Sequence, residues 1–250
     1  MMADKQQITQ KKGKEFTNAR AVNTIQKDSL TRLLAICGIV GPILFIVIIL
    51  VFGQLRPGYD PIRQYMSELG ATGTPNAIVY SIAEALLGLP LIAFAFGLHR
   101  GISKEGKASK LVPILIAVSG LGWIVTSFFP CDPGCVNESV TGKIHGLMGI
   151  IDVWPLLIAP LLILPRLKKD NRWQSYRSFS LIMGTLAVIL FAVEFFTGEV
   201  SSVLVPYRGL LQRLTFFTPF LWIGVMAIRL LCLCRPSKKQ NVTDDEVIGN

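Results

Sequence analysis

Long blocks of apolar residues, separated by short polar connections, make up most of the chain. A block of 18 or more apolar residues predicts a transmembrane helix, because ~20 residues at ~1.5 Å each cross a hydrocarbon core of ~30 Å. The blocks are continuous and about twice as long as the alternating strands of a membrane barrel, so they predict helices. Six such blocks occur, at residues 33–53, 77–98, 111–129, 144–164, 179–198 and 214–234. The predicted fold is therefore an all-α integral membrane protein, a bundle of six transmembrane helices.

The two ends of the chain lie outside these blocks. Residues 1–32 are polar and basic, residues 235–250 are polar, and both have few large apolar residues. Burial of such segments cannot offset the entropy cost of ordering them, so we expect two disordered cytoplasmic tails around one transmembrane domain, residues 33–234. The first apolar block has no small-residue cleavage pattern after it, which favours a permanent span over a signal peptide.

Lysine and arginine are unevenly distributed among the connections. Twenty of the 25 lie in the N-terminal tail, in the second-to-third and fourth-to-fifth connections, and around the C-terminal end. Basic residues stay on the cytoplasmic side, so the pattern predicts a cell-membrane protein with both termini cytoplasmic. The net charge of +9 then reflects topology. The expected partners are membrane lipids rather than nucleic acid. The basic residues predicted on the outer side are Arg56, Arg63, Lys143, Arg208 and Arg213.

The composition supports this class and excludes several others. Hydrophobic residues make up 51% of the chain and charged residues only 16%, whereas about a quarter of a soluble domain is charged. No Walker loop, dinucleotide fingerprint or zinc-ligand spacing is present. The two histidines, His99 and His145, are predicted on opposite sides of the membrane, which argues against bis-histidine haem. We therefore predict no cofactor and no metal, although zinc held by His145, Asp152 and Glu84 remains an alternative.

Two cysteines flank a turn sequence in the second external connection, FFPCDPGCVNES. Cys131 and Cys135 lie on either side of Pro133-Gly134, which favours a tight turn that can bring two cysteines to disulfide distance. We predict a disulfide that shapes this loop. The alternative is a reactive dithiol that exchanges electrons with a membrane quinone, although redox pairs are usually Cys-x-x-Cys at a helix N-terminus. The remaining cysteines are predicted to be buried apolar residues, with acylation open for the last two: Cys37, Cys232 and Cys234.

The first external connection, YDPIRQYMSELGATGTPNA, has helical periodicity. Asp60 can cap a helix with Pro61 at its first position, and Gly70 can end it. Apolar residues recur between them at positions i, i+3, i+4 and i+7, which predicts a short amphipathic helix over residues 61–69. A helix of this length cannot span a membrane, so we expect it to lie at the outer surface or to fold over the bundle as a lid.

Four stretches together carry a resemblance to a known family: YDPIRQYMSELGATGTPNA, FPCDPGC, GKIHG and YRGLLQR. From about residue 35 to residue 232, the chain resembles the six-span membrane proteins catalogued as domain-of-unknown-function family 998. The resemblance implies a six-helix membrane domain with the same order of loops. It implies no reaction and no catalytic residue.

Ionisable residues inside predicted spans are the candidate site. Such residues are costly in lipid and usually functional. All three membrane acids fall in the outer halves of their helices, and the spacing places His145, Gly149 and Asp152 on one helical face. Tyr80 shares a face with Glu84 in the same way, and Arg213 is expected to pair with an acid, most simply Glu194. The candidate catalytic set is Glu84, His145, Asp152, Glu194 and Arg213, and the candidate ligand-binding set is Asp60, Arg63, Glu68, Tyr80 and Gln212.

Three functions remain open from these observations. The first is an outward-facing acidic pocket that binds, and could act on, a lipid or isoprenoid-like amphiphile. The second is a proton-coupled secondary transporter with the acids as its relay, although transporter sites usually lie nearer the midplane. The third is a non-catalytic membrane scaffold in which the polar residues bind helices to one another.

Overall fold

The computed structural model describes residues 29–102, 110–200 and 203–234, and within these ranges the chain is helical and contains no strand. Short 3-10 helices, η1 (Ser67–Gly70), η3 (Pro133–Cys135), η4 (Gln174–Tyr176) and η5 (Val205–Tyr207), lie in the connections. Most of both predicted tails falls outside the described residues, although α2 already begins at Ser29. The helices are α2 (Ser29–Leu55), α3 (Ala77–Gly101), α4 (Leu111–Thr126), α5 (Val140–Leu162), α6 (Leu164–Lys169), α7 (Arg177–Val200) and α8 (Arg208–Leu233).

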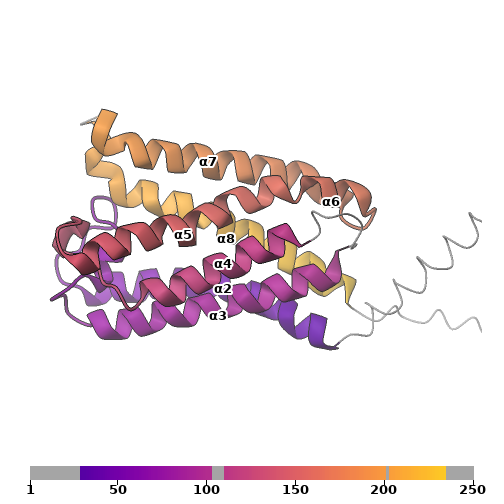
Figure 1. Ribbon diagram of the computed structural model, residues 1–250, viewed down its shortest axis with the longest axis horizontal. Coiled ribbons are helices and arrows are strands. Elements are labelled where there is room, and N and C mark those ends of the chain that lie inside the picture. Colours follow the sequence, from indigo (N-terminus) through magenta and orange to yellow (C-terminus); the bar gives the residue numbers. More distant parts are fainter. Residues whose placement is uncertain (1–28, 103–109, 201–202, 235–250) are drawn as a thin grey trace, which may run out of the picture.

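Six long helices form a closed ring. Each contacts the next in the order α2, α3, α4, α5, α7, α8, and α8 returns to α2. The connections α2–α3, α4–α5 and α7–α8 gather at one end of the bundle, and α6 lies at the other (Figure 1). We call these the loop end and the α6 end. The loops around Asp60, Cys131 and Val205 therefore share one end, as the alternation of spans requires.

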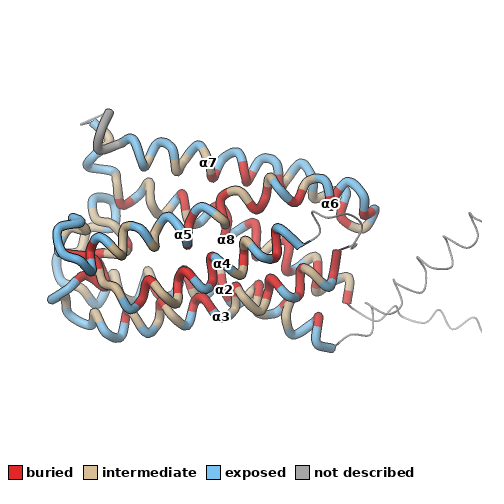
Figure 2. The backbone as a smooth tube through the Cα atoms, in the orientation of Figure 1, coloured by how far each residue is buried: buried red, intermediate tan, exposed pale blue. Residues whose placement is uncertain are grey.

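The outer surface of this bundle is apolar. Leu50, Ile78 and Ile182 are 62%, 77% and 63% exposed, and exposed positions run along the outward faces of the helices (Figure 2). Five helical segments are long and apolar enough to cross a membrane: those that contain α2, α3, α5 with α6, α7 and α8. Such a surface suits a lipid solvent. The chain thus has the architecture of a multi-pass membrane protein.

Helix α4 is shorter than the sequence predicts. It has 16 residues, or about 24 Å at ~1.5 Å per residue, against a hydrocarbon core of ~30 Å. The predicted block continued to Phe129, but Phe128 and Phe129 form tight turns instead, with N–H groups bonded to the carbonyls of Val125 (3.1 Å) and Thr126 (2.9 Å). The sixth apolar segment is therefore a helix that ends early, next to the cysteine loop.

The amphipathic α-helix predicted over residues 61–69 is not formed. The segment makes a turn after Asp60, whose Oδ1 accepts the Ile62 N–H at 2.9 Å, and then the 3-10 helix η1. Side-chain acceptors replace the α-helical hydrogen bonds: Met66 N–H donates to the distant Gln212 Oε1 (2.6 Å), and Tyr65 N–H donates to a carboxylate oxygen of the nearby Glu68 (3.0 Å). Amphipathic spacing alone does not reveal such partners.

Side chains at the α6 end cap helix α3. Arg166 Nη2 donates to the Ile102 carbonyl (3.3 Å), and Arg172 Nη2 (3.4 Å) and Trp173 Nε1 (3.3 Å) both donate to the Gly101 carbonyl. Carbonyls at a helix C-terminus lack intrahelical partners and favour cationic donors. The basic residues of this connection were used above to predict the orientation of the chain. They therefore also stabilise the fold.

Close packing of α3 on α4 depends on two glycines that face each other. A Cβ on Gly88 would lie 2.7 Å from Cγ1 of Ile124 and against the Gly120 carbonyl oxygen. A Cβ on Gly120 would lie 2.7 Å from the Gly88 carbonyl oxygen. Small residues of this kind let helix backbones approach closely in a membrane.

We expect Gly88→Ala to destabilise the bundle by about 1–3 kcal/mol, because the added methyl group forces the two backbones apart. Gly149→Ala is the matched control: a Cβ there meets nothing within 4 Å, so replacing a helical glycine should stabilise by about 0.5–1 kcal/mol. Thermal unfolding in detergent measures both. A Gly88→Ala chain that melts at or above the wild-type temperature would contradict this account.

Candidate functional site

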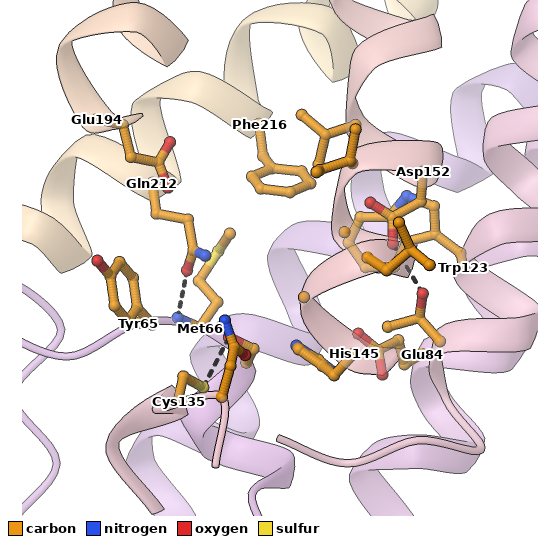
Figure 3. A pocket seen from close by; sticks show the side chains of 18 of the residues that line it. Tyr65, Met66, Glu84, Trp123, Cys135, His145, Asp152, Glu194, Gln212 and Phe216 are labelled. Carbon is orange, nitrogen blue, oxygen red and sulfur yellow. Dashed lines mark hydrogen bonds between the residues drawn. The ribbon is translucent and has the colours of Figure 1, made fainter. Parts of the chain in front are cut away.

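A cavity of about 580 Å³ lies inside the ring, near its loop end. Residues of α3, α4, α5, α7 and α8 line it, together with residues 65–67 of the first loop and residues 135 and 137 of the second (Figure 3). The cavity also reaches the outer surface between α5 and α7, since its lining includes the exposed side chains of Leu147, Ile150 and Phe195. These two helices diverge toward the loop end (Figure 1). The opening is therefore apolar between these two helices, whereas the exposed polar residues Asn137 and Lys143 line the cavity beside the second loop.

Aromatic rings form much of the cavity wall. Trp123 and Phe216 lie edge to face, with their ring centroids 5.6 Å apart, and both line the cavity. Behind them, Phe45 and Phe220 stack at 4.3 Å, and Trp123 also contacts both rings edge-on. This aromatic cluster is continuous with the buried core of the bundle. It gives the cavity rigid apolar walls, of the kind that usually surround a small-molecule ligand.

Three acids project into this apolar space. Glu84 and Asp152 lie together at one side of the view in Figure 3, and Glu194 lies at the other, with Phe216 drawn between them. Asp152 is only 4% exposed. Its Oδ2 accepts the Thr126 hydroxyl at 3.0 Å, whereas Oδ1 has no hydrogen-bond partner in the described part of the chain. Oε2 of Glu194 also lacks one. Buried polar atoms normally have partners, so these oxygens mark positions for a ligand or water.

His145 lines the cavity on the same face of α5 as Gly149 and Asp152, which also line it. Its Nδ1 lies 2.9 Å from the Phe129 carbonyl oxygen. A carbonyl can only accept, so Nδ1 carries the proton and the lone pair is on Nε2. These three residues therefore share one face of α5, as the helical spacing predicted.

The predicted site residues divide into two groups. Six line the cavity: Glu84, His145, Asp152, Glu194, Tyr80 and Gln212. Four do not: Arg213, Asp60, Arg63 and Glu68.

The expected pairing of Arg213 with Glu194 is wrong. The Arg213 guanidinium donates instead to three backbone carbonyls, those of Pro61 (2.5 Å), Gln64 (3.0 Å) and Gly209 (2.8 Å), and to the Tyr59 hydroxyl. The first loop exposes carbonyls that no helix satisfies, and a planar guanidinium with several donors fits such a group better than it fits one carboxylate. Arg213 thus holds the loop onto α8 rather than serving the cavity.

Tyr59, Glu68 and Arg208 complete this attachment. The Tyr59 hydroxyl donates to the Tyr65 carbonyl at 2.9 Å, and burial raises the pKa of Tyr59, which keeps it a neutral donor. Glu68 is buried, and its carboxylate lies 3.5 Å from Arg208 Nη2. Glu68, which was predicted to bind ligand, does not line the cavity and pairs with Arg208 instead. Asp60 and Arg63 form a separate, exposed ion pair at 3.5 Å.

Several lining residues were not predicted from sequence. Lys143 and Asn137 line the cavity beside the second loop, and Thr126 supports Asp152. The sequence does contain a signal for Lys143: it is a charged residue in the first turn of α5, two residues before His145. The apolar Trp123 and Phe216 carry no comparable signal.

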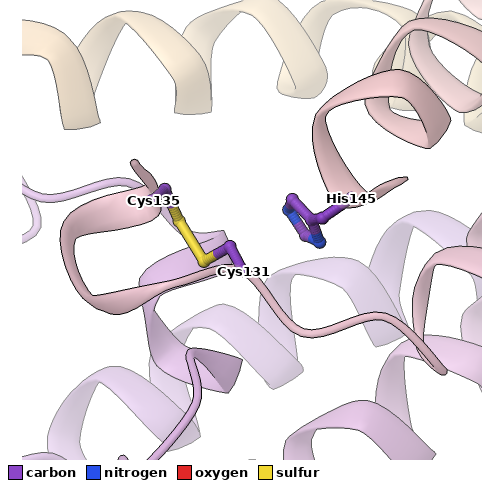
Figure 4. A group of neighbouring side chains, drawn as sticks. All are labelled: Cys131, Cys135 and His145. Carbon is purple, nitrogen blue, oxygen red and sulfur yellow. A yellow bond between two sulfur atoms is a disulfide. The ribbon is translucent and has the colours of Figure 1, made fainter. Parts of the chain in front are cut away.

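The second loop closes one side of the cavity mouth. Cys131 and Cys135 lie at disulfide distance, with Cα atoms 5.0 Å apart, and the structure joins them (Figure 4). Cys135 lines the cavity. The loop is also attached to the first loop, because Thr72 N–H donates to the Cys131 carbonyl at 2.9 Å. The two loops therefore cover the loop end as one unit.

Asp132 prepares the start of α5. Its Oδ2 accepts the N–H groups of Glu138 (3.0 Å) and Ser139 (2.9 Å), and the Ser139 hydroxyl caps the helix by accepting the Gly142 N–H at 3.0 Å. Hydrogen bonds from the side chain and backbone of Ser139 lower the pKa of Asp132. The carboxylate thus positions the helix that presents His145 and Asp152.

Comparison with known proteins agrees with this architecture. The model of a family described as a protein of unknown function (DUF998) matches residues 39–229. The chain belongs to the DUF998 family. No curated protein and no solved structure matches it. The family assignment supports membrane-like helices and assigns no activity, so the function of this DUF998 protein has to be inferred from its own site.

Arg213→Gln should destabilise this DUF998 protein by about 1–3 kcal/mol, because the loop carbonyls lose their donors. It should also increase proteolysis between residues 59 and 66. Arg63→Gln is the control: it removes one exposed ion pair and should change stability by at most about 0.5 kcal/mol. Thermal unfolding and limited proteolysis test the pair. Equal behaviour of the two variants would refute the attachment role.

The stabilising effect of Asp132 should depend on pH. Because its pKa is lowered on folding, its contribution is present above the ordinary aspartate value of ~3.9 and is lost as the pH falls through the folded value. Asp132→Asn should therefore melt below wild type at pH 6, and the two should converge as the pH is lowered below about 4. A difference in melting temperature that stays constant from pH 6 to pH 3 would show that the charge is not responsible.

Proposed function

We propose that this DUF998 protein spans the cell membrane six times, with both termini cytoplasmic, and binds a lipid or isoprenoid-like amphiphile in the cavity. The supporting observation is the combination of an apolar opening between α5 and α7 with partnerless carboxylate oxygens inside. An amphiphile has parts that suit both. Its chain would lie among the aromatic rings and toward the opening, and its head group would meet the acids.

The acids favour a head group that donates hydrogen bonds or carries positive charge. Asp152 offers a free oxygen beside Glu84, and Glu194 offers another across the cavity. A hydroxyl, an amine or a quaternary ammonium group would match these acceptors, and the ring faces nearby would favour a cation further. Lys143 also lines the cavity, but three carboxyl groups outnumber this one lysine, so a phosphate head fits less well. The proposed ligand therefore has a hydroxylated or cationic head.

The distribution of charge supports the proposed orientation. The clusters of basic residues lie toward the α6 end, where Arg166, Arg172 and Lys169 are found, and the positive-inside rule places that end in the cytoplasm. The cavity, near the loop end, would then open in the outer leaflet. Helix α4 would then have its C-terminal end on the outer side, where the two loops cover it.

Cysteine labelling tests the orientation. In a chain with Cys37 and Cys232 replaced by serine, Lys110→Cys should react with a membrane-impermeant maleimide only after the cells are opened. Val203→Cys, which is exposed in the α7–α8 connection, should react in intact cells. Labelling of both from the same side would refute the six-span topology.

Ligand binding is tested by filling the cavity. Gly149 lines it, and a Cβ there meets nothing within 4 Å, so Gly149→Phe should occupy the space without displacing a helix. We expect native mass spectrometry to show a bound amphiphile on wild type and on Gly149→Ala, and at least a tenfold loss of it on Gly149→Phe. An unchanged ligand signal in a well-folded Gly149→Phe chain would contradict the proposal.

Substitution of the acids separates the three functions. Glu84→Gln and Asp152→Asn keep the shape of the side chains but cannot ionise. A scaffold should tolerate both in stability and in cell growth. Loss of ligand with preserved folding favours the binding pocket, whereas loss of uptake driven by a proton gradient in vesicles, with binding preserved, would favour the transporter.

A further inference from the structure

Cys131, Cys135 and His145 form a compact group at the mouth of the cavity (Figure 4). One potential ligand atom from each residue, the two sulfurs and a ring nitrogen, lies within 4.8 Å of the other two. Thiolate and imidazole are the ligands that zinc prefers in proteins. The sequence does not reveal this group, because the start of α5 lies between Cys135 and His145 and their spacing matches no known zinc motif.

A hydrogen bond fixes the tautomer of the imidazole. Its Nδ1 is held by the Phe129 carbonyl at 2.9 Å, which fixes the tautomer and leaves the lone pair on Nε2. The ring faces the two sulfurs in Figure 4. Metal-bound histidines usually donate their other N–H to a carbonyl or carboxylate in this way.

The sulfur side of the group is also supported. The Ser67 hydroxyl lies 3.2 Å from Cys135 Sγ, where it could donate to a thiolate. A hydrogen bond to a thiolate favours its charged form, which is the form that binds metal. The 3-10 helix η1 of the first loop therefore contacts one of the two sulfurs.

Hydrogen bonds hold the loop in addition to the disulfide. Thr72 N–H holds the Cys131 carbonyl (2.9 Å), and Cys135 N–H donates to the Asp132 carbonyl (2.7 Å). The Asp132 carboxylate, in turn, anchors residues 138 and 139. A disulfide that closes so short a loop contributes only roughly 2 kcal/mol in the chain-entropy model. After reduction, both cysteines should stay beside His145.

We propose that reduction of the Cys131–Cys135 disulfide creates a zinc site made of the two thiolates and Nε2 of His145. These are three protein ligands, so a tetrahedral ion keeps a fourth position for water or substrate. Cys135 and His145 both line the cavity, so that position is on the cavity side. The site does not require the amphiphile proposed above, and it makes the loop a redox-controlled metal switch.

The chemistry balances with a dithiol as reductant. The dithiol supplies two electrons and two protons and becomes a cyclic disulfide, while the S–S bond of the chain opens into two thiols. Binding of Zn²⁺ then releases the two thiol protons, and neutral His145 coordinates without losing one. Oxidation reverses the sequence: zinc leaves, the sulfurs bond again, and two electrons pass to the oxidant.

The test uses the full chain in detergent, with Cys37→Ser and Cys232→Ser so that only Cys234 remains as another thiol. The protein is reduced with a phosphine, freed of reductant, and titrated with Zn²⁺ against a chromophoric chelator. We expect one zinc per reduced chain and none on the oxidised chain. Cys131→Ser with Cys135→Ser should abolish binding, and His145→Gln should weaken it at least tenfold, because removing a ligand costs at least as much as removing its support.

Three results would overturn the proposal. They are zinc uptake by the double-serine variant equal to that of the reduced chain, unchanged affinity in His145→Gln, and uptake of copper(I) with none of zinc. A measurement on the unsubstituted chain covers the case in which a variant fails to fold. Zinc should slow alkylation of reduced Cys131 and Cys135 at least tenfold and leave the exposed Cys232 unaffected. Equal slowing at all three cysteines, or none, would also refute the site.

Discussion

Lipid offers no hydrogen bonds, so each polar group that this bundle takes in needs a partner from the chain or from a ligand. The first loop shows how strictly this applies. Several of its carbonyls accept from residues of α8: those of Pro61 and Gln64 from the Arg213 guanidinium, that of Arg63 from Arg208, and that of Ile62 from the Leu210 N–H. The Tyr59 hydroxyl satisfies the Tyr65 carbonyl. Gly209 permits the approach, because a Cβ there would lie 2.7 Å from the Pro61 carbonyl oxygen. A loop of irregular backbone thereby becomes a fixed roof over the ring of helices.

In the cavity beneath this roof, some buried polar atoms have no hydrogen-bond partner. Asp152 and Glu194 each keep a buried oxygen without a partner in the described residues, while the walls around them are aromatic. Rigid walls preserve the space, since the rings interlock with the core. The cavity also has exposed apolar side chains between α5 and α7. This combination of apolar surface and polar acceptors is why we propose an amphiphile as the ligand.

The second loop contributes chemistry rather than volume. Its backbone is held by hydrogen bonds to Thr72 and Asp132 as well as by the disulfide. In our proposal, the same two cysteines are a covalent staple when oxidised and, together with His145, metal ligands when reduced.

Local properties of the sequence determined the helices, the sharing of loop ends, and the common face of His145, Gly149 and Asp152, because periodicity and chain alternation need no distant partner. Only the tertiary structure decided the rest. Residues 61–69 have an amphipathic spacing but form a turn and a 3-10 helix, since Gln212 takes the Met66 N–H from 146 positions away. Arg213 was expected to pair with an acid, but it donates to backbone carbonyls. His145 was expected near acids, and folding also placed it beside two cysteines. Partners that far apart in the chain leave no local pattern to read.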